Sequence, residues 1–285
     1  MKQLFTIALI TAATTVYAQP KIISQAFITT NTTIVAPEND EEQSRTFTSD
    51  DGQIRTIRFG GGGDSETKTT TWLKDDLVKT YSESEIAVTT VIRDNSKKIT
   101  TTIMEMMGKK TGFYATDEDQ AEMRKRMDSM MQSRGGQNIS FGGSTSAPVY
   151  SISYIDESKK ISGYTCKKAF VIGTRSNGKS DTTTVWYCPD FKFQSLPSTG
   201  GSAGGFGGFN VTAESNDMEA LAGFPMQYER TMNRGRKMTV QVTKLVIDKE
   251  VKAKEFDIPK DIEIKPLKEM QNGAGPGFQF RIAGQ

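Results

Sequence analysis

Residues 159–190 read KKISGYTCKKAFVIGTRSNGKSDTTTVWYCPD and contain both cysteines of the 285-residue chain. Two runs rich in Thr, Val, Ile and aromatic residues, 160–174 and 179–188, flank the tripeptide Ser-Asn-Gly. Such runs are typical of β-strands, and a glycine that supplies a positive φ, here Gly178, favours a short hairpin loop. The stretch therefore predicts an antiparallel hairpin.

The loop also predicts the register of this hairpin. If Ser-Asn-Gly forms the loop, Arg175 faces Lys179, and the numbers of facing residues add up to 354. Cys166 and Cys188 satisfy the same condition. Directly facing positions of an antiparallel pair lie within the Cα separation that a disulfide spans. The two cysteines are therefore expected to face each other across the hairpin.

Similar β-strand signals continue on both sides of the hairpin, separated by Gly, Asn, Asp and Pro. Strands are expected at 22–35, 53–59, 66–73, 76–82, 84–93, 97–106, 109–115, 148–156, 224–230 and 236–248. Their regular spacing favours one antiparallel meander. We interpret the acidic stretch 37–51 as a solvated loop, because its carboxylates lack the spacing of a calcium loop.

One segment has helical rather than strand periodicity. Residues 117–134 begin with three acidic residues and end before a Gly-Gly pair, as helices often do. Met123, Met127, Met130 and Met131 recur at helical spacing and form one apolar stripe. Two interpretations are open: the helix packs its methionines on the sheet, or it forms a lid over an apolar cavity.

The N-terminus predicts export. Residues 1–18, MKQLFTIALITAATTVYA, combine a lysine, a short apolar core and a small-residue cleavage site. These are the features of a secretory signal peptide, and the core is too short to span a membrane. Cleavage between Ala18 and Gln19 would release a soluble protein to the periplasm or the exterior. In an oxidising compartment a Cys166–Cys188 disulfide is favoured over two free thiols.

The rest of the mature chain, 19–270, is interpreted as a single domain. Glycine-rich loops are expected at 60–63, 135–146 and 194–208, with a flexible tail at 271–285. Without the signal peptide the chain has 35 basic and 34 acidic residues, because only Lys2 is charged in the removed piece. This balance provides no electrostatic argument for nucleic-acid binding, and we expect no transmembrane segment in the mature chain.

The residue types present exclude much of enzyme chemistry. The chain has no histidine, which removes Ser-His-Asp and Cys-His catalysis and histidine metal sites. Two cysteines alone are a poor metal site, and no phosphate-binding glycine motif stands between a strand and a helix. Scattered carboxylates leave acid–base chemistry open in principle. We therefore expect no catalytic residue, no metal and no cofactor.

Three short motifs resemble a known family. KKISGYTCKKA, VWYCPD and AGFPMQYE are similar to motifs of exported GLPGLI-type proteins, although the turn at Gly223, Phe224 and Pro225 lacks the second glycine of the G-L-P-G pattern. The ending EFDIPKDIEIKPLKEM resembles exported domains grouped with LolA-type lipoprotein carriers. The resemblance implies a mainly β (α+β) fold: a large curved antiparallel sheet, a LolA-like half-barrel, with one or two helices on its concave face.

Two functions follow as hypotheses. A carrier would bind a lipid, an acyl chain or a lipidated protein on the concave face, with the following candidate contacts: Trp72, Phe113, Met123, Met127, Met130 and Trp186. A structural or interaction protein of the cell envelope would use the same residues as ordinary core. An enzyme ranks third.

Overall fold

A computed structural model describes residues 19–37, 44–48, 54–58, 64–85, 87–106, 108–133, 149–174, 178–194, 218, 220–232 and 235–272. The expected signal peptide, the three glycine-rich loops except Gln194, and most of the tail lie outside these residues. Within them the chain is mainly β, and no helix is both long and apolar enough to cross a membrane.

The first half of the chain forms six neighbouring strands of the main sheet. In spatial order they are β2 (Gln25–Val35), β5 (Ser65–Lys74), β6 (Leu77–Glu83), β7 (Ala87–Asp94), β8 (Ile99–Met106) and β9 (Lys109–Thr116). Each pairs antiparallel with the next. This half is the meander that the alternating pattern predicts.

The second half continues the same sheet on the other side of β2. In spatial order from the edge it contains β10 (Val149–Ile161), β11 (Tyr164–Thr174), β12 (Ser180–Cys188), β14 (Phe224–Thr231) and β15 (Lys237–Val246). β15 pairs with β2, so the first and last long strands are neighbours. The prediction of one continuous meander is wrong here, because local periodicity carries no information about which distant strands pair.

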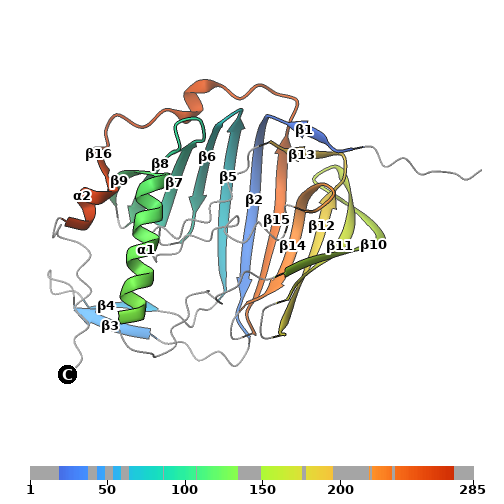
Figure 1. Cartoon of the computed structure of the whole chain (residues 1–285), viewed down its shortest axis with the longest axis horizontal. Coiled ribbons are helices and arrows are strands. Elements are labelled where there is room, and N and C mark those ends of the chain that lie inside the picture. Colours follow the sequence, from blue (N-terminus) through green and yellow to red (C-terminus); the bar gives the residue numbers. More distant parts are fainter. Residues whose placement is uncertain are drawn as a thin grey trace, which may run out of the picture.

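The sheet has twelve strands and remains open. β16 (Ile264–Pro266) adds a parallel strand beside β9, so β16 and β10 are the two edges. Figure 1 shows the sheet curving between these edges, which stand well apart. The expected fold class, a mainly β protein with a large curved sheet, is confirmed, with β16 as the one parallel exception.

Two small sheets were not fully expected. β1 (Lys21–Ile23) separates from β2 at Ser24 and pairs parallel with β13 (Phe191–Phe193). β3 (Ser44–Thr48) pairs with β4 (Ile54–Arg58), so part of the stretch interpreted as a solvated loop is a strand. The residues of β3, SRTFT, alternate as in a strand, although the acidic residues before them led us to expect a loop.

The central hairpin has the predicted register. Lys167 pairs with Tyr187 and Thr174 with Ser180, so facing positions add up to 354, and Gly178 has a φ of +76°. The preceding turn was misplaced: β10 runs to Ile161, and the chain reverses at Ser162 and Gly163, both with positive φ. The run 160–174 was expected as one strand, although the Ser-Gly pair inside it is itself a turn signal.

Two α-helices lie among the described residues, α1 (Asp117–Ser133) and α2 (Leu267–Asn272), with a short 3-10 helix at Ala253–Phe256. α1 leaves β9 directly and stands in front of the β7–β9 part of the sheet in Figure 1. The predicted helix at 117–134 is confirmed to within one residue. α2 was not expected.

The core lies mainly in the second half. One cluster includes Cys166, Cys188, Phe191, Phe224 and Met226, and reaches β2 and β5 through Ala26 and Leu73. A second cluster includes Val171, Val185, Tyr187, Tyr228 and Val240. Only the first cluster joins the two halves of the sheet; the second lies within the second half.

Candidate functional site

Trp186 lies beneath two lysines on one face of the sheet. Lys159 Nζ is 4.2 Å and Lys168 Nζ 5.7 Å from the centroid of its ring. Lys159 also donates to Gln227 Oε1 over 2.8 Å, and Lys168 donates to Glu157. A cation over a tryptophan face is attracted by the ring quadrupole. The ring is therefore held and covered by the chain itself.

Trp72 has a similar environment. Phe27, its direct partner on β2, meets it edge to face at a centroid distance of 5.6 Å, and Lys79 Nζ lies 5.4 Å from the Trp72 ring. Lys79 donates to the carbonyl oxygen of Glu255 over 2.7 Å. The lysine thereby ties the ring to the chain segment that follows β15.

The two tryptophans share a face of the sheet, whereas Phe113 lies on the other. Cross-strand pairing connects Trp186 through Gln227, Gln241 and Asn31 to Lys68, which is four residues from Trp72 on the same strand. Phe113 shares a cross-strand row with Thr71. Because successive residues of a strand point to opposite faces, Trp72 and Phe113 are separated by the sheet.

The methionine helix begins on the face of Phe113. Arg93, which shares a cross-strand row with the buried Leu73 and Val78, binds Asp117 of α1 through two hydrogen bonds of 2.6 and 3.0 Å. Met123 is half-buried, and the side chains of Met127 and Met130 lie outside the described residues. The structure therefore does not bring the six candidate ligand contacts together on one face.

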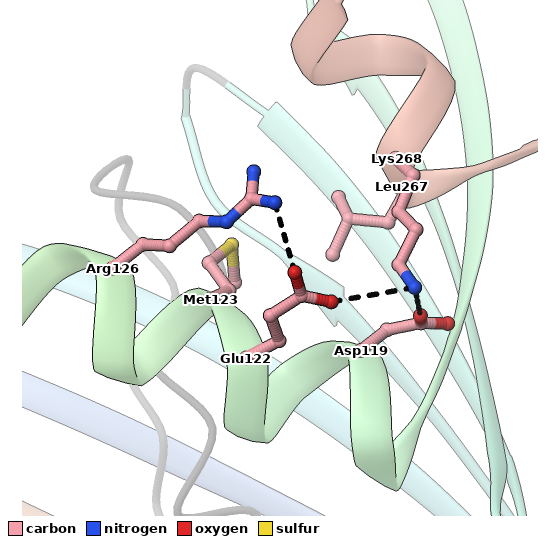
Figure 2. A pocket seen from close by; sticks show the side chains of 6 residues that line it. All are labelled: Asp119, Glu122, Met123, Arg126, Leu267 and Lys268. Atoms are coloured by element: carbon pink, nitrogen blue, oxygen red, sulfur yellow. Dashed lines mark hydrogen bonds and ion pairs between the residues drawn. The ribbon is translucent and has the colours of Figure 1, made fainter.

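Met123 lines a small hollow between α1 and α2. Figure 2 shows that Asp119, Glu122 and Arg126 of α1 and Leu267 and Lys268 of α2 complete its lining. Lys268 Nζ bridges Asp119 at 2.8 Å and Glu122 at 3.4 Å. The hollow has a volume of ≈ 20 Å³, room for about one water molecule. Its polar groups are satisfied by one another.

Hydrogen bonds at the start of α1 explain why Asp119 and Glu122 are ionised. Asp119 accepts a hydrogen bond from the Thr116 amide, and the Asp119 amide donates to Thr116 Oγ1, which is a reciprocal helix cap. Hydrogen bonds from Lys268 and from the Thr116 amide lower the pKa of Asp119 to about 2. The same lysine lowers the pKa of Glu122. Both carboxylates are held ionised.

Cys166 and Cys188 lie fully buried in the core, one position beyond the Lys167–Tyr187 pair. The hairpin register is confirmed as far as the Lys167–Tyr187 pair, but both cysteines are free thiols, so the predicted disulfide is not present in the structure. Burial raises the pKa of each thiol to about 11. A protonated thiol is a poor partner for thiol–disulfide exchange, because the thiolate is the nucleophile.

The motif turn at Gly223, Phe224 and Pro225 is structural. A side chain at Gly223 would place its Cβ 2.0 Å from the carbonyl oxygen of Cys188, so only glycine allows this approach of the two strands. Phe224 is buried against Phe193, with ring centroids 4.6 Å apart. The turn therefore fixes β14 against β12 and against the small β1–β13 sheet.

The free edge of β10 was missed in the sequence analysis. Val149, Tyr150 and Tyr154 are 75%, 38% and 49% exposed, and they are half of the large apolar side chains exposed among the described residues. The signal for this edge is the sequence VYSISYI at 149–155, which contains no charge or proline.

The acidic side chains and cysteines of the described residues are dispersed. Among them no three Cys, Asp or Glu side chains lie close enough to hold a metal ion. The carboxyl groups with a shifted pKa, those of Asp94, Asp119 and Glu122, all shift downward. A general acid needs a raised pKa near the working pH, so these groups suit ion pairing rather than proton donation.

Fold and site together define an open, curved β-sheet protein with a packed core and an exposed apolar edge. The family model described as "Domain of unknown function (DUF4412)" matches residues 65–262. The match covers more than half of the chain, and the protein belongs to this family. The finer resemblance to GLPGLI-type proteins and LolA-type carriers is not supported by the comparisons, and curated proteins provide no match.

Solved structures show only distant likeness. Those described as "Structure of PNGF-II in P21 space group" and "Structure of PNGF-II in C2 space group" are 14% and 12% identical, with TM-scores of 0.33 and 0.35. Each alignment covers 87% of this chain and 33% or 32% of that chain. The protein thus spans about a third of their length. Likeness at this level implies no shared function.

Proposed function

We propose that this protein is exported and acts as a non-enzymatic interaction protein of the cell envelope. The observation that carries the proposal is the distribution of apolar side chains. Buried ones form two clusters, whereas three of the six large exposed ones among the described residues lie on the edge strand β10. Exposed apolar groups along a free strand edge are typical of a protein-binding surface.

Export rests on the signal-peptide features of residues 1–18. The intact mass of the secreted protein should correspond to a chain that begins at Gln19. A mass that includes residues 1–18 would contradict export and would remove the argument for an oxidising compartment.

The absence of histidine from the chain and the ionised state of Asp94, Asp119 and Glu122 support a non-enzymatic role. The lysine-covered tryptophans support it as well, because Lys159 and Lys79 occupy positions from which a planar ligand would stack on Trp186 and Trp72.

An apolar ligand is the second candidate. Met123 and Leu267 provide apolar lining where α1 meets α2, at the position expected for a methionine lid. Pockets for small molecules usually measure about 300 Å³ or more. The hollow at Met123 is more than tenfold smaller, so it supports a ligand less strongly than the exposed β10 edge supports a protein interaction.

One experiment separates the two candidates. The purified mature protein is delipidated and titrated with an environment-sensitive apolar dye, followed by competition with a fatty acid. An interaction protein should show no saturable, displaceable binding. A carrier should bind the dye saturably, release it when fatty acid is added, and lose binding in Met127→Asp. Lys97→Asp, which changes the charge of an exposed residue in the turn between β7 and β8, is the control.

A further inference from the structure

β10 is the edge of the main sheet, and it is unusually open. It pairs with β11 on one side, and no described strand lies on its other side. Native sheets commonly protect such an edge with lysine, proline or a short strand. β10 has 13 residues, and its first seven contain none of these devices. A backbone edge of this kind can accept another strand.

The charges of β10 begin only where the strand bends. The pairing with β11 shifts between Ile155 and Ser158, and Asp156 and Glu157 lie in this irregularity. The segment 149–155 before it is neutral and pairs regularly with β11. A straight, neutral segment is thus bounded by a bulge, which sets its length at about seven residues.

The sequence of this segment reads almost the same in both directions. VYSISYI is symmetric about Ile152, with Val149 and Ile155 as the only unequal pair, and both are β-branched. In an antiparallel self-pair centred on Ile152, Tyr150 faces the partner subunit's Tyr154 and Ser151 faces the partner subunit's Ser153. Aromatic, hydroxyl and β-branched cross-strand pairs are each favourable. Such symmetry is what a two-fold interface between identical strands requires.

The tyrosines of the segment are already held in place. Tyr154 meets Tyr187 edge to face at a centroid distance of 5.5 Å, and its hydroxyl accepts a hydrogen bond from the Ala222 amide. Tyr150 lies against Gly173 on β11, where a side chain would collide with its ring. Fixed side chains lose little entropy on association.

We propose that two copies of the chain associate edge to edge through residues 149–155 of β10, antiparallel and centred on Ile152. This inference rests on the proposed function, since it names the partner of the exposed edge. It joins two open sheets into one continuous sheet, and backbone hydrogen bonds between the two β10 strands provide the affinity.

Two double variants test both the site and its register. Ser151 and Ser153 are exposed, so substitution leaves the fold of one copy unchanged. In Ser151→Lys/Ser153→Lys, two like charges face each other at each of two symmetric positions. In Ser151→Lys/Ser153→Glu, opposite charges face each other at the same positions. Like charges directly opposite are destabilising and opposite charges favourable, so we expect the dimer Kd to rise about tenfold or more in the first variant and to stay near that of the wild type in the second.

Sedimentation velocity of the mature protein over a range of concentrations measures these constants, and circular dichroism checks the fold of each variant. Amide exchange of residues 149–155, slower at high than at low protein concentration, is expected for the wild type. A monomeric wild type, an unchanged Kd in the first variant, or equal losses in both variants would each overturn the self-pairing. The outcome of the dye titration does not depend on this result, so either proposal can fail alone.

Discussion

The two halves of the sheet are built from different side chains. In β2 and β5–β9, most buried positions with a polar side chain are threonines: Thr29, Thr32, Thr67, Thr69, Thr101 and Thr102. In β10–β12, β14 and β15, the buried positions are mainly apolar, among them Ala169, Val185, Met226 and Val240. The first half therefore combines buried threonines with buried apolar side chains such as Ile28, Leu73 and Val78, whereas the second half buries almost only apolar side chains.

This difference indicates which half of the sheet contributes more to the free energy of unfolding. In a closely packed apolar core, any change of side-chain volume is destabilising. At a buried threonine, the effect of a substitution depends mainly on whether the hydroxyl has a hydrogen-bond partner. We therefore expect large effects of substitution in the second half and small effects, in either direction, in the first.

The largest effect is expected for Gly223→Val. Its Cβ would lie 2.0 Å from the Cys188 carbonyl oxygen, and the atoms it meets are all backbone of Cys188 and Pro189, which cannot move aside as a flexible side chain can. We expect a loss of more than about 3 kcal/mol in the free energy of unfolding, measured by urea denaturation. Gly178→Ala is the control: its φ is +76° but its surroundings are open, so the loss should be about 1–2 kcal/mol. Equal losses would contradict a packing role for Gly223.

Oxidation of Cys166 and Cys188 should produce the next effect. The bond would close a loop from residue 166 to 188, for which chain entropy predicts about 3 kcal/mol of stabilisation. We expect unfolding of protein from an oxidising compartment to occur at higher urea concentration without reductant than with it. Cys188→Ser should remove this dependence. If both thiols are alkylated freely in that protein once it is unfolded, no disulfide forms.

Thr32→Val should stabilise the first half. Thr32 is 2% exposed, and its hydroxyl has no hydrogen-bond partner among the described residues. Removal of an unsatisfied buried hydroxyl is expected to raise the free energy of unfolding by about 1 kcal/mol. Thr69→Val is the matched control, because Thr69 Oγ1 and Ser82 Oγ are 3.1 Å apart. It should lower the value by about 1 kcal/mol. If both variants lower the free energy of unfolding, the hydroxyl of Thr32 is not an unsatisfied group.

The smallest effect concerns pH. The pKa of Asp119 is lowered to about 2 from an ordinary value of 3.8, so its contacts stabilise the fold above about pH 4 and are lost as the pH falls toward 2. Lys268 is 61% exposed and Asp119 only 17%, so solvent screens the pair from the lysine side and we expect less than about 1 kcal/mol. Thermal unfolding at pH 6 and pH 3 should show a smaller pH-dependent loss in Asp119→Asn than in the wild type. An identical loss would show that other groups dominate.

The contrast between the halves also explains what the sequence could predict. The register of the Cys166–Cys188 hairpin followed from one loop glycine and clear runs. The threonine-rich strands were located well, but threonine suits both faces of a sheet, so the alternation did not reveal that Trp72 and Phe113 point to opposite sides. The pairing of β15 with β2 and of β16 with β9 depends on contacts distant in sequence, which no local pattern encodes.

The candidate site, too, depends on contacts between residues that are distant in sequence. Residue types predicted an aromatic and methionine face, whereas the lysines that cover Trp186 and Trp72 come from neighbouring strands. Lys168 sits directly opposite Trp186, and this pair could have been inferred from the register. Lys159 reaches the ring from β10 only because the Ser162–Gly163 turn sets the position of that strand.

The β2–β15 ladder has a consequence for synthesis. Val35 pairs with Lys237, about 200 residues later, so β2 has no partner on that side until almost the whole domain has been made. At about 5–20 residues per second, this interval lasts roughly 10–40 s. Contacts of such long range are slow to form. We therefore expect the central ladder to be absent while most of the chain is being made, and such an unfolded chain would suit the proposed export.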